Sequence, residues 1–141
     1  MIFKADFTDI MKAVDNAVEA AIPAGKYGLY ETARITADAI RSEAGTLPYK
    51  GSTVSQIQNA VGIAKMDSTV DTVTTAVSFD GYFEESHFPI IFFVREICQG
   101  TSRIPQNDFM RRAAARVKAQ AVQTGQKAAE DFVNRILKGA D

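Results

Sequence analysis

Hydrophobic residues recur at three- and four-residue steps along the first third of the chain, and this spacing predicts amphipathic helices. The first apolar row consists of Phe7, Ile10, Met11, Val14, Val18, Ala21 and Ile22. Pro23 and Gly25 follow it and predict the end of that helix. A second row, narrow and rich in alanine, predicts a helix from about Tyr27 to Ala44 that another element can approach closely. Gly45 and Pro48 predict its end.

The apolar period then changes to two, which predicts β-strands. The first alternation is made by Ile57, Val61 and Ile63. A second strand is predicted over 70–79, a segment enriched in threonine, valine and phenylalanine. The stretch KMDSTVD predicts the turn between these strands, and the pair Asp80-Gly81 predicts a hairpin after the second one.

The apolar run FPIIFFVREIC fits either a buried strand or a short helix, and we favour a helical turn after Pro89. A last helix is predicted to begin near Asn107 or Asp108, either of which suits a helix N-terminus. Gly125 weighs against one unbroken rod. The residues predicted to be buried along this helix are Phe109, Ala113, Val117, Ala121, Ala129, Phe132, Val133, Ile136 and Leu137.

This order of elements predicts an α+β fold, in which a small antiparallel β-sheet packs against two or three helices, one of them a long C-terminal helix. The 141 residues suit one domain with its own core. Within that domain we expect an N-terminal helix in residues 1–25 and a core in residues 26–141.

Composition and charge narrow the function classes. The chain is 46% hydrophobic and 23% charged, as in ordinary globular proteins. Its net charge of -1 argues against a dedicated nucleic-acid binder. The single cysteine, Cys98, excludes an internal disulfide. The run FPIIFFV is too short to span a membrane, and MIFKADFTDIM lacks the apolar core of a signal peptide, so we expect a soluble protein made in the cytoplasm.

Candidate catalytic residues are few. His87 is the only histidine; beside Glu84 and Glu85 it would bind a metal weakly, and a solvated loop position is the favoured interpretation. Cys98 lacks the sequence signature of a nucleophile, which favours a structural thiol. We therefore expect no enzymatic activity, no cofactor and no metal.

The most distinctive stretch is GTSRIPQNDFMRRAAARVK, residues 100–118, here named the basic segment. It sets five basic residues against one acid, Asp108: the basic residues are Arg103, Arg111, Arg112, Arg116 and Lys118. Basic side chains at the start of a helix oppose the helix dipole, which favours compensation by groups outside the helix.

The basic segment resembles a loop of the phage tail-completion proteins, a family of minor tail or head–tail joining proteins. The family loop reads Gly-Thr-Ser-basic-x-Pro-Ala-x-Pro-Phe-Leu-Arg-Pro-Ala and leads into a final helix. The matching residues are Gly100, Thr101, Ser102, Arg103, Pro105, Phe109, Met110, Arg111 and Ala113. Asp108 and Arg112 replace family prolines, Gln99 stands where an aromatic residue often precedes the glycine, and PYKGSTVSQI lacks the family's Asp-Thr-Gly motif. The resemblance extends over residues 28–137, with a matching order of elements, and implies a divergent member.

What the resemblance implies is a non-enzymatic structural component of a phage or phage-like tail. Such a protein forms a homo-oligomeric ring, commonly sixfold, at the head-proximal end of the tail, where it completes the tail or joins it to the head. Its partners would be further copies of itself and neighbouring tail and connector proteins; any contact with DNA in the channel would not be sequence-specific, and no membrane is involved. It would reside in the virion or tail-like particle after synthesis in the host bacterial cytoplasm.

A ring also gives the basic segment a role. Gly100 would let the chain turn, Pro105 would stiffen the loop that also contains Thr101 and Ser102, and Phe109 would pin the helix start to the core. The candidate interface residues are Arg103, Arg111, Arg112 and Arg116. We rank contact with another protein chain first, simple solvation of a helix face second, and direct contact with DNA third.

Two other function classes stay open. A different tail-tube or baseplate protein would also lack catalysis and polymerise. A small nucleic-acid-binding module would use the basic segment together with stacking by Tyr27, Tyr30 or Tyr49, although the near-neutral net charge weighs against it.

Overall fold

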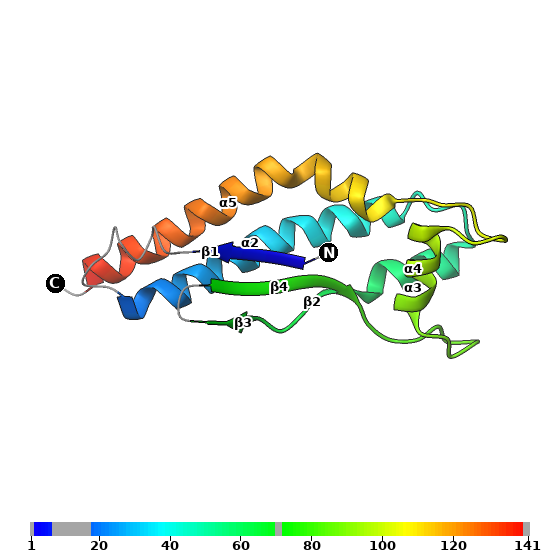
Figure 1. The fold of residues 1–141 in the computed structure, drawn as a ribbon, viewed down its shortest axis with the longest axis horizontal. Coiled ribbons are helices and arrows are strands. Elements are labelled where there is room, and N and C mark those ends of the chain that lie inside the picture. Colours follow the sequence, from blue (N-terminus) through cyan, green and yellow to red (C-terminus); the bar gives the residue numbers. More distant parts are fainter. Residues whose placement is uncertain (1, 7–17, 70–71, 140–141) are drawn as a thin grey trace.

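Two long helices, α2 (Val18–Ala44) and α5 (Phe109–Gly139), run antiparallel and lie side by side along the molecule (Figure 1). The computed structural model describes residues 2–6, 18–69 and 72–139. The remaining elements in chain order are β1 (Ile2–Asp6), α3 (Gly51–Ala60), β2 (Val61–Ile63), β3 (Asp67–Ser68), β4 (Thr72–Phe79) and α4 (Ile90–Gln99). Helix α2 lies between α5 and a small antiparallel sheet, so the fold is α+β with a long C-terminal helix, as predicted.

The close approach of α2 and α5 depends on two buried glycines. A Cβ atom at Gly28 would lie 2.5 Å from the carbonyl oxygen of Gly125, and a Cβ atom at Gly125 would overlap the Thr32 hydroxyl. The alanine-rich stripe of α2 therefore does face a closely packed partner, as expected. Gly125 does not interrupt α5, which corrects the prediction at that residue: glycine is required there because two backbones meet.

Helix α2 also begins earlier than predicted. Pro23 and Gly25 lie inside it, and the chain continues as helix to Ala44. Ala24 and Gly25 are buried while Pro23 is exposed, so packing of this turn outweighs the local cost of proline and glycine in a helix. The expected N-terminal helix of residues 1–25 is therefore wrong at both ends, since residues 2–6 form strand β1 and residues 18–25 belong to α2. Its middle part, residues 7–17, lies outside the described residues.

Strand β4 is the centre of the sheet. It pairs antiparallel with β1 on one side, with Ile2 opposite Ala76, and with β2 and β3 on the other, with Val61 opposite Phe79. Its alternating pattern is that of a strand with one buried face, and the buried residues are Val73, Thr75, Val77 and Phe79. The buried Thr75 hydroxyl donates a hydrogen bond of 2.7 Å to the carbonyl oxygen of Ala64, which satisfies the polar group inside the core.

Two sequence predictions near the sheet are wrong. Ile57 lies in helix α3, not in a strand, and the helix passes directly into β2 at Val61. The four-residue spacing of Ile57 and Val61 fits a helix as well as a strand, and burial of Ile57 in the core decides between them. After β4, Gly81 turns the chain with φ +90°, but only an isolated bridge between Tyr82 and Pro89 follows, instead of a hairpin.

Helix α4 follows Pro89 as favoured, with Ile90, Val94 and Ile97 buried. Helix α5 begins at Phe109, directly after the predicted start residues. The main hydrophobic core forms where the last turns of α2 meet α3, the end of β4, α4 and the start of α5. The basic segment is therefore attached to the main hydrophobic core through Phe109 and Ala113.

Candidate subunit interface at the basic segment

Gly100 ends helix α4 in a conformation that favours glycine. Its φ is 78° and its ψ is 149°, and its N–H donates a hydrogen bond of 2.8 Å to the carbonyl oxygen of Glu96. A Cβ atom at Gly100 would lie 3.0 Å from the Cβ atom of Gln106, which is tighter than ordinary contact. The turn expected at Gly100 is thus present, and both backbone angle and space explain the residue.

Thr101 closes the next part of the loop. Its hydroxyl oxygen accepts hydrogen bonds from the N–H groups of Arg103 (3.2 Å) and Ile104 (2.9 Å). Its own N–H donates to the carbonyl oxygen of Ile104 over 2.8 Å, and the N–H of Asn107 donates to the carbonyl oxygen of Ile97 over 2.8 Å. These bonds fold the loop back onto the end of α4 and give it a defined shape. Ser102 and Pro105 lie exposed on it.

Phe109 anchors the start of α5. Its side chain is fully buried and packs edge-on against Phe79 of the central strand, with ring centroids 6.3 Å apart. Half-buried Ile104 and Met110 pack against the same core. The loop is therefore fixed to the core on both sides of its exposed part.

Arg112 and Arg116 both pair with Glu43, an acid that sequence reasoning did not select. The guanidinium nitrogens of Arg112 and Arg116 lie 3.5 Å and 3.1 Å from the Glu43 carboxylate, and Arg112 also donates to the side-chain oxygen of Asn107 over 2.8 Å. Glu43 lies at the C-terminal end of α2, where an acid opposes the helix dipole, just as arginines do at the start of α5. Because the two helices are antiparallel, these ends meet and each compensates the other. The signal in the sequence that could have pointed to this pairing is the acid at the C-terminal end of a predicted helix.

Arg103 and Arg111 differ from that pair. The Arg111 side chain is 86% exposed, and its ion-pair partner Asp108 lies at the long distance of 3.9 Å. The Arg103 guanidinium is exposed and forms no hydrogen bond or ion pair with any residue that the structure describes. The structure thus divides the four candidate arginines into two that hold α5 to α2 and two that are exposed, Arg103 in the ordered loop and Arg111 in the first turn of α5.

The residues considered for chemistry stand apart from the basic segment or are shielded. His87 is exposed on the turn before α4, with a φ of 55°. Cys98 is half-buried, and burial, with a further contribution from the Asp108 carboxylate, raises the pKa of its thiol. Within residues 2–6, 18–69 and 72–139, no three histidine, cysteine, aspartate or glutamate side chains are grouped to hold a metal ion. Among the described helices, none has the length and hydropathy of a membrane span.

No family model matches this chain, and comparisons with curated proteins and with solved structures find no match either.

Proposed function

We propose that this chain is a structural component of a phage or phage-like tail that forms a homo-oligomeric ring at the head-proximal end of the tail, where it completes the tail or joins it to the head. In this role it has no catalytic activity and needs no cofactor. Its partners are other copies of itself and the adjoining tail and connector proteins.

The observation that carries the proposal is the basic segment with its family-like sequence. Three of its matching residues have a clear physical role, since Gly100 adopts a positive φ, Thr101 closes the turn, and Phe109 anchors the following helix in the core. The α+β order of elements around the loop is also that of the resembled family. Arg103 in the ordered loop and Arg111 at the start of α5 suit a contact surface better than a catalytic site, because both guanidiniums remain accessible to a partner.

The test is the location and copy number of the chain in assembled particles. Cells that produce the particle are made to express the chain with an affinity tag, and purified particles are examined by cryo-electron microscopy and quantitative mass spectrometry. We expect several copies in one ring at the head-proximal end, and unjoined heads and tails when the gene is deleted. A single copy per particle, or wild-type particle yield without the gene, would contradict the proposal.

A further inference from the structure

A cluster of exposed aromatic side chains lies at the other end of α4. We name it the aromatic tip: Tyr82, Phe88 and Phe92, with the acids Glu84 and Glu85. The three aromatic side chains are 65%, 40% and 47% exposed, respectively, and the rings of Phe88 and Phe92 pack edge-on with centroids 6.2 Å apart. Exposed aromatic side chains that pack together, as Phe88 and Phe92 do, are typical of a protein contact site.

The aromatic tip has a fixed shape. The N–H of Phe83 donates to the carbonyl oxygen of Phe88 over 3.0 Å, and the N–H of His87 donates to the carbonyl oxygen of Phe83 over 2.9 Å. The N–H of Glu84 donates to the side-chain oxygen of Gln56 in α3 over 2.8 Å, which ties the tip to the body of the molecule. A surface already ordered in the free subunit loses little conformational entropy when a partner binds.

The aromatic tip and the outward arginines carry opposite charge. Asp80, Glu84 and Glu85 are exposed, and the sequence has no lysine or arginine in residues 80–94. The tip lies at the N-terminal end of α4 and the loop with Arg103 at its C-terminal end, and both project from the same end of the molecule (Figure 1). Helix α4 has 10 residues, which separates the two surfaces by about 15 Å. No ion pair among the described residues joins them within one chain.

We propose that the aromatic tip of one subunit receives Arg103 and Arg111 of the next subunit in the ring. The proposal rests on the ring assembly proposed above and names its contact surfaces. Because the tip and the loop are different surfaces of the same chain, the contact is head-to-tail, the type that closes into rings.

The chemistry of the aromatic tip suits a guanidinium. Such groups stack on aromatic faces and pair with carboxylates, and residues 82–92 expose side chains of both kinds. Its Phe92 ring already has the guanidinium carbon of Arg95 from the same chain 5.5 Å from its centroid, which leaves Tyr82 and Phe88 for the partner. The two exposed carboxylates of this segment, Glu84 and Glu85, also favour a cationic protein surface over DNA phosphates as the occupant.

The first experiment traps the contact in purified full-length protein. In a Cys98→Ser background, Ser86→Cys places a thiol in the tip turn and Ser102→Cys places one in the loop. Under mild oxidation at high protein concentration, the variant with both cysteines should form a ladder of disulfide-linked oligomers, whereas each single-cysteine variant can form only dimers. Absence of the ladder at the highest soluble concentration overturns the proposal.

The second experiment exchanges the charges in that trapping background. Arg103→Glu with Arg111→Glu should reduce the ladder about tenfold or more, and so should Glu84→Lys with Glu85→Lys. An equal mixture of the two variants should restore it, because each tip then meets a loop of opposite charge. Two matched controls change exposed charges elsewhere on α5: Lys127→Glu with Lys138→Glu, and Glu130→Lys with Asp131→Lys. Both controls should leave the ladder unchanged.

The outcomes separate this inference from the proposed function. A ring in the particle without the disulfide ladder overturns the tip-to-loop contact and leaves the proposed function in place. A charge-dependent ladder from a protein that enters no particle supports the contact and contradicts the tail function. If Arg103→Glu with Arg111→Glu weakens only the retention of the protein on duplex DNA, the arginines serve DNA and the proposed contact is wrong.

Discussion

Glu43 changes the interpretation of the basic segment more than any residue within it. In the sequence, five basic residues face one acid, and the cluster is uniform. In the fold, Glu43 pairs with Arg112 and Arg116, and the other three basic residues, Arg103, Arg111 and Lys118, are exposed. Sequence reasoning selected the segment but could not divide it, because the pairing joins residues 69 and 73 positions apart.

The pairing of Glu43 predicts a small, salt-dependent contribution to stability. Glu43→Gln should lower the free energy of unfolding by about 1 kcal/mol, because the guanidiniums are half-exposed and surface pairs contribute roughly 0–1 kcal/mol each. Urea denaturation at low and high salt measures this loss, which should shrink as salt screens the pairs.

A double-mutant cycle supplies the control. Glu43→Gln should couple to Arg116→Gln and add independently to Arg103→Gln, because Arg116 contacts the Glu43 carboxylate and Arg103 does not. Equal coupling to both arginines would contradict the division of the cluster.

Gly100 allows a matched glycine comparison. Gly100→Ala should cost about 1–3 kcal/mol, because alanine rarely adopts a φ of 78° and its Cβ would press against Gln106. Gly51→Ala is the control: that glycine begins α3 with open space around it, so alanine should be neutral or slightly stabilising. Thermal unfolding of both variants checks the difference, and equal melting temperatures would mean that the loop conformation does not require glycine.

At the scale of elements, the sequence predicted helix faces better than helix ends. The alanine row of α2 and the buried face of β4 follow from periodicity, because burial repeats with the geometry of the element. The ends of α2 and the identity of α3 depend on contacts with distant parts of the chain. Pro23 predicts the end of a helix from local sequence alone, yet α2 continues through it because Ala24 and Gly25 in the same turn are buried. Strand β1 exists through its pairing with β4, about 70 residues away in the chain, and no local pattern announces such a partner.

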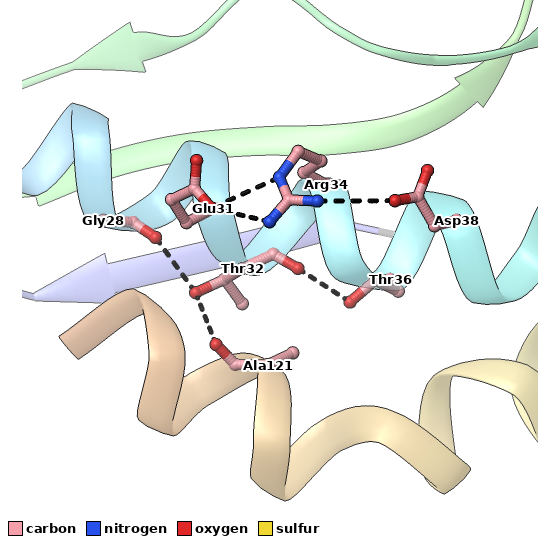
Figure 2. A network of polar contacts seen from close by, with 7 residues as sticks. All are labelled: Gly28, Glu31, Thr32, Arg34, Thr36, Asp38 and Ala121. Atoms are coloured by element: carbon pink, nitrogen blue, oxygen red, sulfur yellow. Dashed lines mark hydrogen bonds and ion pairs between the residues drawn. The ribbon is translucent and has the colours of Figure 1, made fainter. Parts of the chain in front are cut away.

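At Gly125, helix propensity and tertiary packing favour different residues. Within a helix, glycine costs about 1 kcal/mol relative to alanine, so it reads as a weak point. Between α2 and α5 its missing side chain leaves room for the Thr32 hydroxyl, which donates to the carbonyl oxygens of Gly28 (3.1 Å) and Ala121 (3.2 Å) (Figure 2). The hydroxyl therefore connects the two helices where Gly28 and Gly125 face each other.

This packing predicts that a helix-favouring substitution will destabilise the protein. Gly125→Ala should cost about 1–3 kcal/mol despite the higher helix propensity of alanine, because its Cβ would overlap the Thr32 hydroxyl. Gln126→Ala, at the exposed neighbouring position of the same helix, is the control and should be nearly neutral. Chemical denaturation compares them. A Gly125→Ala variant as stable as the wild type would show that the helices can separate at no cost.

In the whole molecule, a residue of the core and an exposed arginine are close neighbours in the chain. Phe109 and Arg111 are two positions apart, yet one is fully buried and the other almost fully exposed. The predicted burial of Phe109 is confirmed. Which arginines are free for a partner depends on how α2 and α5 meet, and that follows only from the three-dimensional fold.

This arrangement predicts that stability and assembly respond to different residues. Phe109→Ala should cost about 3–5 kcal/mol, because it empties a fully buried site against Phe79. Arg103→Glu with Arg111→Glu should leave the melting temperature of the purified subunit nearly unchanged, since exposed charges without close partners contribute little. If the chain completes the tail as proposed, the same double variant should leave tails without heads, because truncating one partner of a buried charge pair at an interface costs about 2–5 kcal/mol.

The test of this prediction measures both the stability of the subunit and its assembly into particles. Melting temperatures of the purified subunits are measured beside the yield of joined particles in electron micrographs, with Lys127→Glu and Lys138→Glu as a charge-matched control on exposed positions of α5. The control should assemble normally, because it introduces the same change of charge away from the loop. If the arginine variant also yields joined particles at the wild-type level, Arg103 and Arg111 only solvate the loop, and the ordered turn built by Gly100 and Thr101 presents no contact surface. Loss of joined particles at an unchanged melting temperature leaves assembly, and not folding, as the step that needs these two side chains.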